Sequence, residues 1–159
     1  MTREQFLRRL DSAWSAFRAS YAGLTEEELL RPGVTGRWSA RDLIAHVTWW
    51  EEEALKHLPV ILAGRRPPRY SVTYGGIDAF NALKTEATKG LPLAEVLRRQ
   101  EEVHARVVAL VEGVAESEVA GDTRFRRRLR SDTYGHYPKH TASIEKWRAA
   151  RTARAGDDK

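Results

Sequence analysis

The chain has 159 residues, 42% of them hydrophobic and 31% charged, which is typical of one globular domain with a buried core. Lysine and arginine number 27 against 22 acidic residues, so the net charge is +5 with neutral histidines. The absence of cysteine excludes disulfides, thiolate nucleophiles and cysteine-based zinc or iron–sulfur sites. No apolar run reaches the roughly 18 residues of a membrane-spanning helix, and the N-terminus lacks the apolar core of a signal peptide. We therefore expect a cytoplasmic protein without membrane contact, with one domain over residues 1–155 and a disordered tail at 156–159.

Hydrophobic residues recur at helical spacing in the first part of the chain. A capping box formed by Thr2 and Gln5 predicts a helix that runs to about Tyr21. A second capping box, Thr25 with Glu28, predicts a short helical turn.

A third capping box at Ser39 predicts the second long helix, about residues 39–63, and Pro59 should kink its last turn. Trp49 and Trp50 are adjacent in this helix. Both cannot point to the centre of one core, so we expect one of them to face a partner chain.

The remaining elements are a shorter helix and two long ones. The expected ranges are 78–88 for the shorter helix, 92–112 for the third long helix with Pro92 as its first residue, and Asp132 or Thr133 to about Arg154 for the last. Residues 64–76 and 113–131 should be long crossover loops. The sequence thus predicts an all-α protein, a four-helix bundle with short additional helices.

Three histidines carry the main functional signal. His46 lies on the inward stripe of the second long helix, while His136 and His140 have the i, i+4 spacing that puts two imidazoles on one helix face. Three nitrogens with open positions remaining are the ligand set of a catalytic metal ion. Pro138 lies between two of these ligands. Either it kinks a helix that begins near Asp132, or the regular helix starts only around Pro138, and the choice decides whether the three rings converge.

Other polar residues are candidates for supporting roles. Glu53 follows His46 by two helical turns and could be a fourth ligand, a hydrogen-bond acceptor for a ligand, or a general base. A proton could also be moved by Tyr134 or Tyr137. The lone His104 is more typical of a core residue than of the site, and His57 falls off the apolar stripe and should lie on the surface.

Five segments carry a family resemblance: Trp38-Ser39, Ala45-His46, Trp49-Trp50, Asp78-Ala79-Phe80-Asn81 and Tyr134-Gly135-His136-Tyr137-Pro138-Lys139-His140. Together they resemble the DinB-like superfamily, in particular its ClbS/DfsB-like branch. The resemblance implies a four-helix bundle, often a homodimer, with a divalent metal, frequently nickel or zinc, held by His46, His136 and His140. Relatives include mycothiol-dependent maleylpyruvate isomerases and bacillithiol transferases, in which the metal activates a low-molecular-weight thiol. ClbS-type members act on reactive genotoxic metabolites, and some of them lack the histidines.

Three functions follow from these observations. The leading one is a metal-dependent thiol transferase or hydrolase for a small-molecule substrate, with Glu53 or Tyr137 moving protons and a basic side chain holding an anionic substrate. The second is a ClbS-like protein that sequesters a small molecule without turnover, in a cavity lined by Trp49, Trp50, Phe80 and Trp147. The third and weaker one is nucleic-acid binding through the arginine-rich segment 124–130, which contains no base-reading motif.

Overall fold

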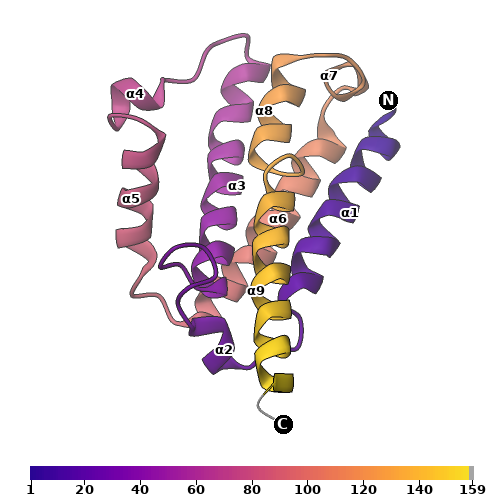
Figure 1. The fold of residues 1–159 in the computed structure, drawn as a ribbon. Helices are drawn as coiled ribbons and strands as arrows, with labels where there is room; N and C mark the ends of the chain where they lie inside the picture. The colour runs from indigo at the N-terminus through magenta and orange to yellow at the C-terminus, as the bar shows by residue number, and fades with distance from the viewer. Residues whose placement is uncertain (158–159) are drawn as a thin grey trace.

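The computed structural model describes residues 1–157, and within them four long helices form a bundle (Figure 1). These are α1 (Arg3–Tyr21), α3 (Ala40–Leu62), α6 (Leu93–Gly113) and α9 (Tyr137–Asp157). In Figure 1, α1 and α9 run downward, whereas α3 and α6 run upward. The short helices are α2 (Glu26–Leu30), α4 (Tyr70–Thr73), α5 (Ile77–Thr88), α7 (Glu116–Ala120) and α8 (Arg124–Asp132). The all-α class expected from the sequence is confirmed.

Each of the three expected capping boxes is present, at Thr2, Thr25 and Ser39. The Ser39 hydroxyl accepts from the Asp42 amide at 3.1 Å, and the Asp42 carboxylate accepts from the Ser39 amide at 2.9 Å. These bonds satisfy backbone donors that a helix start leaves free, and they fix where α3 begins. No helix in the described part of the chain combines the length and hydropathy that a membrane crossing requires.

Helix α5 forms an additional layer on α3, on the side away from α1 (Figure 1). It carries Asn81, whose side-chain oxygen accepts from the indole nitrogens of Trp49 at 3.3 Å and Trp50 at 3.1 Å. Both indoles are buried within the chain. The chain itself therefore buries both indoles, because α5 covers the face of α3 that a bare four-helix bundle would expose. The homodimer stays a prediction.

The segment after α6 differs most from expectation. Residues 113–131 are not a plain crossover loop but contain α7 and α8, and residues 64–76 contain α4. The last long helix begins later than Asp132 or Thr133, because α8 ends at Asp132 and α9 begins only at Tyr137. Pro138 explains this later start, because proline is tolerated in the first turn of a helix but not in its interior.

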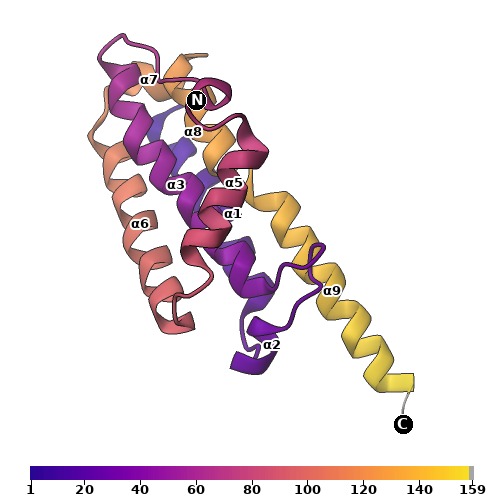
Figure 2. The same ribbon diagram turned by 90° about the vertical axis from the view of Figure 1, so that its left-hand side faces the viewer.

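A tight turn joins α8 to α9. The Gly135 amide donates to the Arg130 carbonyl at 2.9 Å, and a Cβ atom on Gly135 would lie only 2.8 Å from that same oxygen. The turn therefore requires glycine, and the path of the turn determines the position of His136. Figure 2 shows α9 continuing beyond the rest of the bundle. It includes residues 156–157, which were expected in the tail, while 158–159 lie outside the described residues.

Candidate metal centre and its cavity

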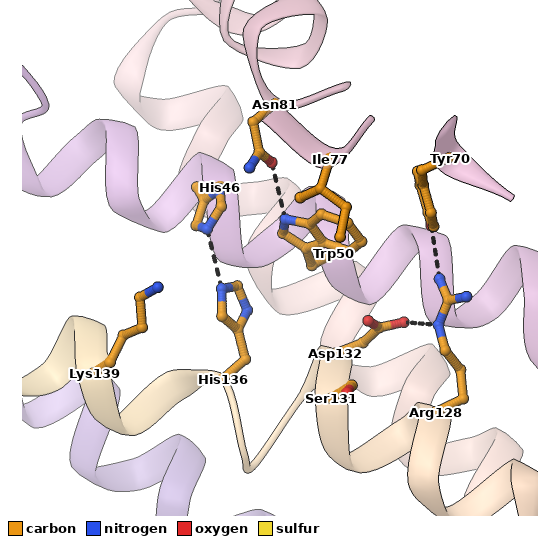
Figure 3. Close-up of a pocket in the computed structure, with 10 residues that line it drawn as sticks. All are labelled: His46, Trp50, Tyr70, Ile77, Asn81, Arg128, Ser131, Asp132, His136 and Lys139. Carbon is orange, nitrogen blue, oxygen red and sulfur yellow. Dashed lines mark hydrogen bonds and ion pairs between the residues drawn. The ribbon is translucent and has the colours of Figure 1, made fainter. Parts of the chain in front are cut away.

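The three predicted histidines converge. His136 Nε2 lies 3.0 Å from His46 Nε2 and 2.9 Å from His140 Nε2. One nitrogen from each ring falls within 4.8 Å of the others. Figure 3 shows the His46 and His136 rings facing each other across the space between α3 and the start of α9.

The local fold explains this convergence. His46 lies on the buried stripe of α3, between Leu43 and Trp50. His136 is the last residue before α9, and His140 is in the first turn of that helix, so the two rings are one turn apart. Pro138 is the second residue of α9 and does not come between them as a kink.

All three imidazoles are kept neutral. Burial, together with the other two rings and Lys139, lowers the pKa of His46 to about 2. Burial, His136 and Lys139 lower the pKa of His140 to about 3, and burial and Lys139 lower that of His136 to about 4. No carboxylate is among the causes of these shifts. Neutral imidazole is the protonation state that can donate a lone pair to a metal ion.

Hydrogen bonds among the three rings cannot satisfy all of the ring nitrogens that meet here. His136 Nε2 contacts two nitrogens, yet a neutral ring nitrogen offers either one proton or one lone pair. One of the two contacts is therefore unsatisfied in any choice of tautomers, at a cost for buried polar atoms.

A divalent ion would resolve this conflict, because all three lone pairs could point to it. Two imidazole nitrogens bound to one ion at about 2.0–2.1 Å lie roughly 2.8–3.4 Å apart for octahedral or tetrahedral angles. The separations of 2.9 and 3.0 Å fit that range. The Nδ1 atoms of His46 and His136 have no hydrogen-bond partner within residues 1–157, so no protein acceptor fixes those two rings from behind.

The histidines border an open cavity of about 370 Å³ (Figure 3). One wall comes from α3, one from α4 and α5, and one from α8 and the start of α9. The lining residues are His46, Trp50, Tyr70, Ile77, Asn81, Arg128, Ser131, Asp132, His136 and Lys139. The lining is mixed, with apolar surface for a small organic ligand and a few fixed polar groups.

A series of hydrogen-bonded polar side chains runs along the side of this cavity away from His46. The Arg128 guanidinium donates to Asp132 Oδ2 at 2.6 Å and to the Tyr70 hydroxyl at 2.7 Å. The Tyr70 hydroxyl donates to Glu53 Oε1 at 3.0 Å. Burial and the negative charge of Glu53 raise the pKa of Asp132 to about 6, although Arg128 opposes the shift. Glu53, predicted as a ligand or base, is thus the last member of this hydrogen-bonded series and does not line the cavity.

His57 is buried, contrary to the expectation of a surface position. Its Nε2 lies 3.4 Å from Glu53 Oε1. The apolar stripe of α3 did not predict this, because His57 is covered by a residue far along the chain, Tyr70 of α4. The ring packs edge-on to Tyr70, with centroids 6.1 Å apart.

Tyr137 and His104 belong to a second polar cluster, on another face of α3. The Tyr137 hydroxyl donates to Glu51, whose Oε1 also lies 3.0 Å from His104 Nδ1. The His104 ring stacks on Trp14 with centroids 3.7 Å apart. Neither Tyr137 nor His104 lines the cavity.

Of the aromatic residues expected around a ligand, Trp50 lines the cavity. Phe80 is fully buried beneath it, and Trp147 packs under the Arg151 guanidinium far along α9. Tyr134 packs against Phe6 instead.

Sequence reasoning missed Tyr70, Arg128 and Asp132 as cavity residues. The i, i+4 spacing of Arg128 and Asp132 is a recognisable ion-pair signal, but only once residues 124–132 are known to be helical. Tyr70 gave no signal, because it lies in a helix of four residues inside an expected loop.

A family model described as the DinB superfamily matches residues 9–152. The chain belongs to the DinB superfamily. A search of curated proteins gives no significant match.

Three solved structures of DinB-like shape are similar to this chain. One is the colibactin self-resistance protein ClbS in complex with double-stranded DNA, with 18% identity, a TM-score of 0.77 and coverage of 91% of this chain and 94% of that one. The sibling lethal factor precursor DfsB has 12% identity, a TM-score of 0.78 and coverage of 95% and 97%. An uncharacterised protein from Escherichia coli UTI89 has 15% identity, a TM-score of 0.80 and coverage of 95% of both chains. At these identities the likeness establishes the fold alone, which agrees with the resemblance found in the sequence.

Proposed function

We propose that this DinB superfamily protein is a metal-dependent enzyme whose divalent ion, zinc or nickel, is held by His46, His136 and His140. The observation that carries the proposal is the convergence of three neutral imidazole nitrogens that cannot satisfy one another by hydrogen bonding. Only nitrogen ligands from three residues would be used, which leaves coordination positions for a reactant. When bound, such an ion supplies Lewis acidity that lowers the pKa of a water or a low-molecular-weight thiol.

The remaining cavity residues would bind and orient a small-molecule substrate. Trp50 presents an apolar surface whose orientation is fixed by its hydrogen bond to Asn81. The exposed Lys139 side chain extends toward the same space as the His46 ring (Figure 3) and would attract an anionic group on the substrate. Arg128 is paired with Asp132 and is therefore the weaker anion receptor of the two.

Elemental analysis of the purified protein tests the proposal, with the His46→Ala variant purified in parallel as the control. We expect near-stoichiometric transition metal in the natural chain and its loss in the variant. A natural chain that contains no transition metal and takes up none at micromolar zinc or nickel would refute the proposal.

The reaction type is tested next, with the metal-loaded protein and two probe reactions. Hydrolysis of 4-nitrophenyl acetate reports activated water, and thiol conjugation to an electrophilic aromatic substrate reports activated thiol. Turnover in either assay that is lost on metal removal supports an enzyme. Tight binding of an aromatic ligand with unchanged affinity after metal removal, and no turnover, would instead support a ClbS-like sequestering protein.

Nucleic-acid binding is a second candidate, and one cleft favours it. An opening of about 280 Å³ between α1 and α8 is lined by Arg9, Arg126, Arg127 and Arg130, together with Asp122 and Tyr134. Four arginines against one aspartate give a net charge of +3 there. Arginine guanidinium groups match phosphate oxygens in geometry and charge.

Fluorescence anisotropy with a labelled DNA duplex tests this second candidate. We expect the affinity to fall steeply between low and physiological salt, and the Arg126→Ala/Arg130→Ala variant to bind more weakly. The Arg98→Ala variant is the control, since Arg98 is an exposed arginine of α6 outside this cleft. No binding at low salt would exclude the candidate, as would equal weakening by the control.

A further inference from the structure

We propose that Asp132 is the proton-transfer residue of the cavity, and that Glu53 acts through Tyr70 and Arg128 to hold it in place. This inference rests on the proposed function, because a nucleophile in the cavity must lose a proton. It assigns the role expected for Glu53 to a residue on a different helix, and gives Glu53 a positioning role.

Asp132 has the position that the role requires. It is the last residue of α8, is only 3% exposed, and still lines the cavity that the histidines border. Figure 3 shows its carboxyl group between His136 and Arg128, with one oxygen bonded to Arg128 and the other directed toward the His136 side. Glu53 does not line the cavity, so it does not reach a substrate there.

The orientation of the carboxyl group is fixed by successive hydrogen bonds. Arg128 Nε holds Oδ2 of Asp132, and the other end of the guanidinium is held by the Tyr70 hydroxyl. Tyr70 is in turn held by Glu53, which is anchored on α3, the same helix that carries His46. The proton-transfer residue is thereby fixed relative to one of the proposed ligands, as productive proton transfer requires.

Charge in the network accounts for partial protonation near neutral pH. Two buried carboxylates, Glu53 and Asp132, share one guanidinium, so their full ionisation leaves an uncompensated negative charge. Burial and the charge of Glu53 raise the pKa of Asp132 to about 6, so Asp132 is the carboxyl group that takes up a proton. Environments that separate the pKa values of neighbouring carboxyl groups are a known means of assigning acid and base roles.

The ionisable groups that face Asp132 come from each element packed around it. Glu53 of α3 and Arg128 of α8 act on the Asp132 carboxyl group, and Tyr137 of α9 feels its charge. Tyr70 of α4, His136 of the turn and Lys139 of α9 line the same cavity. Glu53 is the acidic group among them whose charge raises the pKa of Asp132. Neutralising Glu53 by substitution is therefore the change that should shift the pKa of Asp132 most.

The proton step balances without an added reactant. The O–H bond of a water, or the S–H bond of a thiol, breaks, and an O–H bond forms on Asp132. The electron pair stays on the nucleophile, and Asp132 then returns the proton to the leaving group of the substrate.

The first test measures protonation directly, by ¹³C NMR titration of the Asp132 carboxyl group in the metal-free protein. We expect a pKa near 6. The Glu53→Gln variant should lower this pKa by roughly 1, because it removes a buried like charge. The matched control is Glu52→Gln, the neighbouring carboxylate of α3, which lies at a different pocket and should leave the titration unchanged. An Asp132 pKa near 4 in the natural chain, or one insensitive to Glu53→Gln, would overturn the tuning role.

The second test is the pH profile of 4-nitrophenyl acetate hydrolysis by the zinc-loaded protein. Asp132→Asn should lower kcat/KM by about 100-fold or more and remove the acidic limb near pH 6, with zinc affinity unchanged. Glu53→Gln should keep the limb but move it to lower pH, an effect that a purely structural role would not produce. The proton-transfer role is refuted by an unchanged limb in Asp132→Asn, or by no hydrolysis in the natural chain. Failure to bind zinc would refute the proposed function instead, while the NMR titration still judges the network.

Discussion

Two histidine-containing clusters lie on different faces of α3, and they differ in what satisfies them. On the core face, His104 meets the Glu51 carboxylate, which also accepts from Tyr137, and Trp14 stacks on the imidazole. On the cavity face, the ring nitrogens of His46 and His140 meet that of His136, and no carboxylate of residues 1–157 hydrogen-bonds to the three rings. A protein acceptor thus explains the buried His104, whereas the three cavity histidines have the free ring nitrogens that could hold an ion.

Removing one histidine from each cluster tests whether the two clusters have separate roles. His140→Ala should weaken zinc binding by at least about 100-fold, more than the roughly 10–100-fold lost when a residue merely supports a ligand. His104→Ala should leave the zinc affinity of the folded protein unchanged, since its ring is bonded to Glu51. Calorimetric zinc titrations of both variants measure the effect. Similar losses in the two variants would show that the clusters do not have separate roles.

Protonation of Asp132 should make the stability of the protein depend on pH in a specific direction. Its pKa is raised from 3.8 to about 6 on folding, so the folded state holds the proton more tightly. That contribution to stability is fully present below pH 3.8 and is lost as the pH rises through 6. Asp132→Asn cannot ionise, so its free energy of unfolding relative to the natural chain should rise by roughly 3 kcal/mol over that interval. Urea unfolding from pH 4 to pH 7 checks this, and a pH-independent difference would contradict it.

Tyr137→Phe tests whether the core cluster supports the fold without serving the metal centre. The variant removes the hydroxyl that donates to the buried Glu51. It should reduce the free energy of unfolding by roughly 1–3 kcal/mol, the cost of an unmade buried hydrogen bond. The zinc affinity should be unchanged, although Tyr137 directly follows a proposed ligand. Weaker zinc binding without a loss of stability would place Tyr137 in the centre itself.

The turn that delivers His136 should be sensitive to one added methyl group. Gly135→Ala brings Cβ to 2.8 Å from the Arg130 carbonyl oxygen, so the turn must shift. We expect zinc affinity to fall by roughly tenfold, the lower range for a change that displaces a ligand without removing it. Gly113→Ala at the end of α6 is the matched control, because a Cβ there meets nothing within 4 Å. Equal zinc affinities in the two variants would show that the turn does not position His136.

The sequence predicted the features that depend on neighbouring residues alone. Capping boxes and apolar spacing located the starts of α1, α2 and α3, and the stripe of α3 placed His46 inward. The family resemblance supplied the same three histidines that the structure brings together. Pro138 does not kink the chain between His136 and His140, because α9 begins at Tyr137 and Pro138 lies in its first turn.

What the sequence did not predict depends on contacts between distant segments. The α4–α5 layer buries Trp49 and His57, and no periodicity within α3 reveals that layer. The network from Glu53 to Asp132 joins α3, α4 and α8, and two of those helices lie where loops were expected. Cavities form between such elements, so their lining is the part of the site least accessible to sequence reasoning.

Zinc titration of the metal-free protein against a competing chromophoric chelator tests whether His46, His136 and His140 hold a metal ion. We predict one ion per chain, with a dissociation constant at or below the micromolar range, and loss of that binding in His46→Gln. Failure of the natural chain to compete with the chelator, or equal binding by His46→Gln, would contradict it.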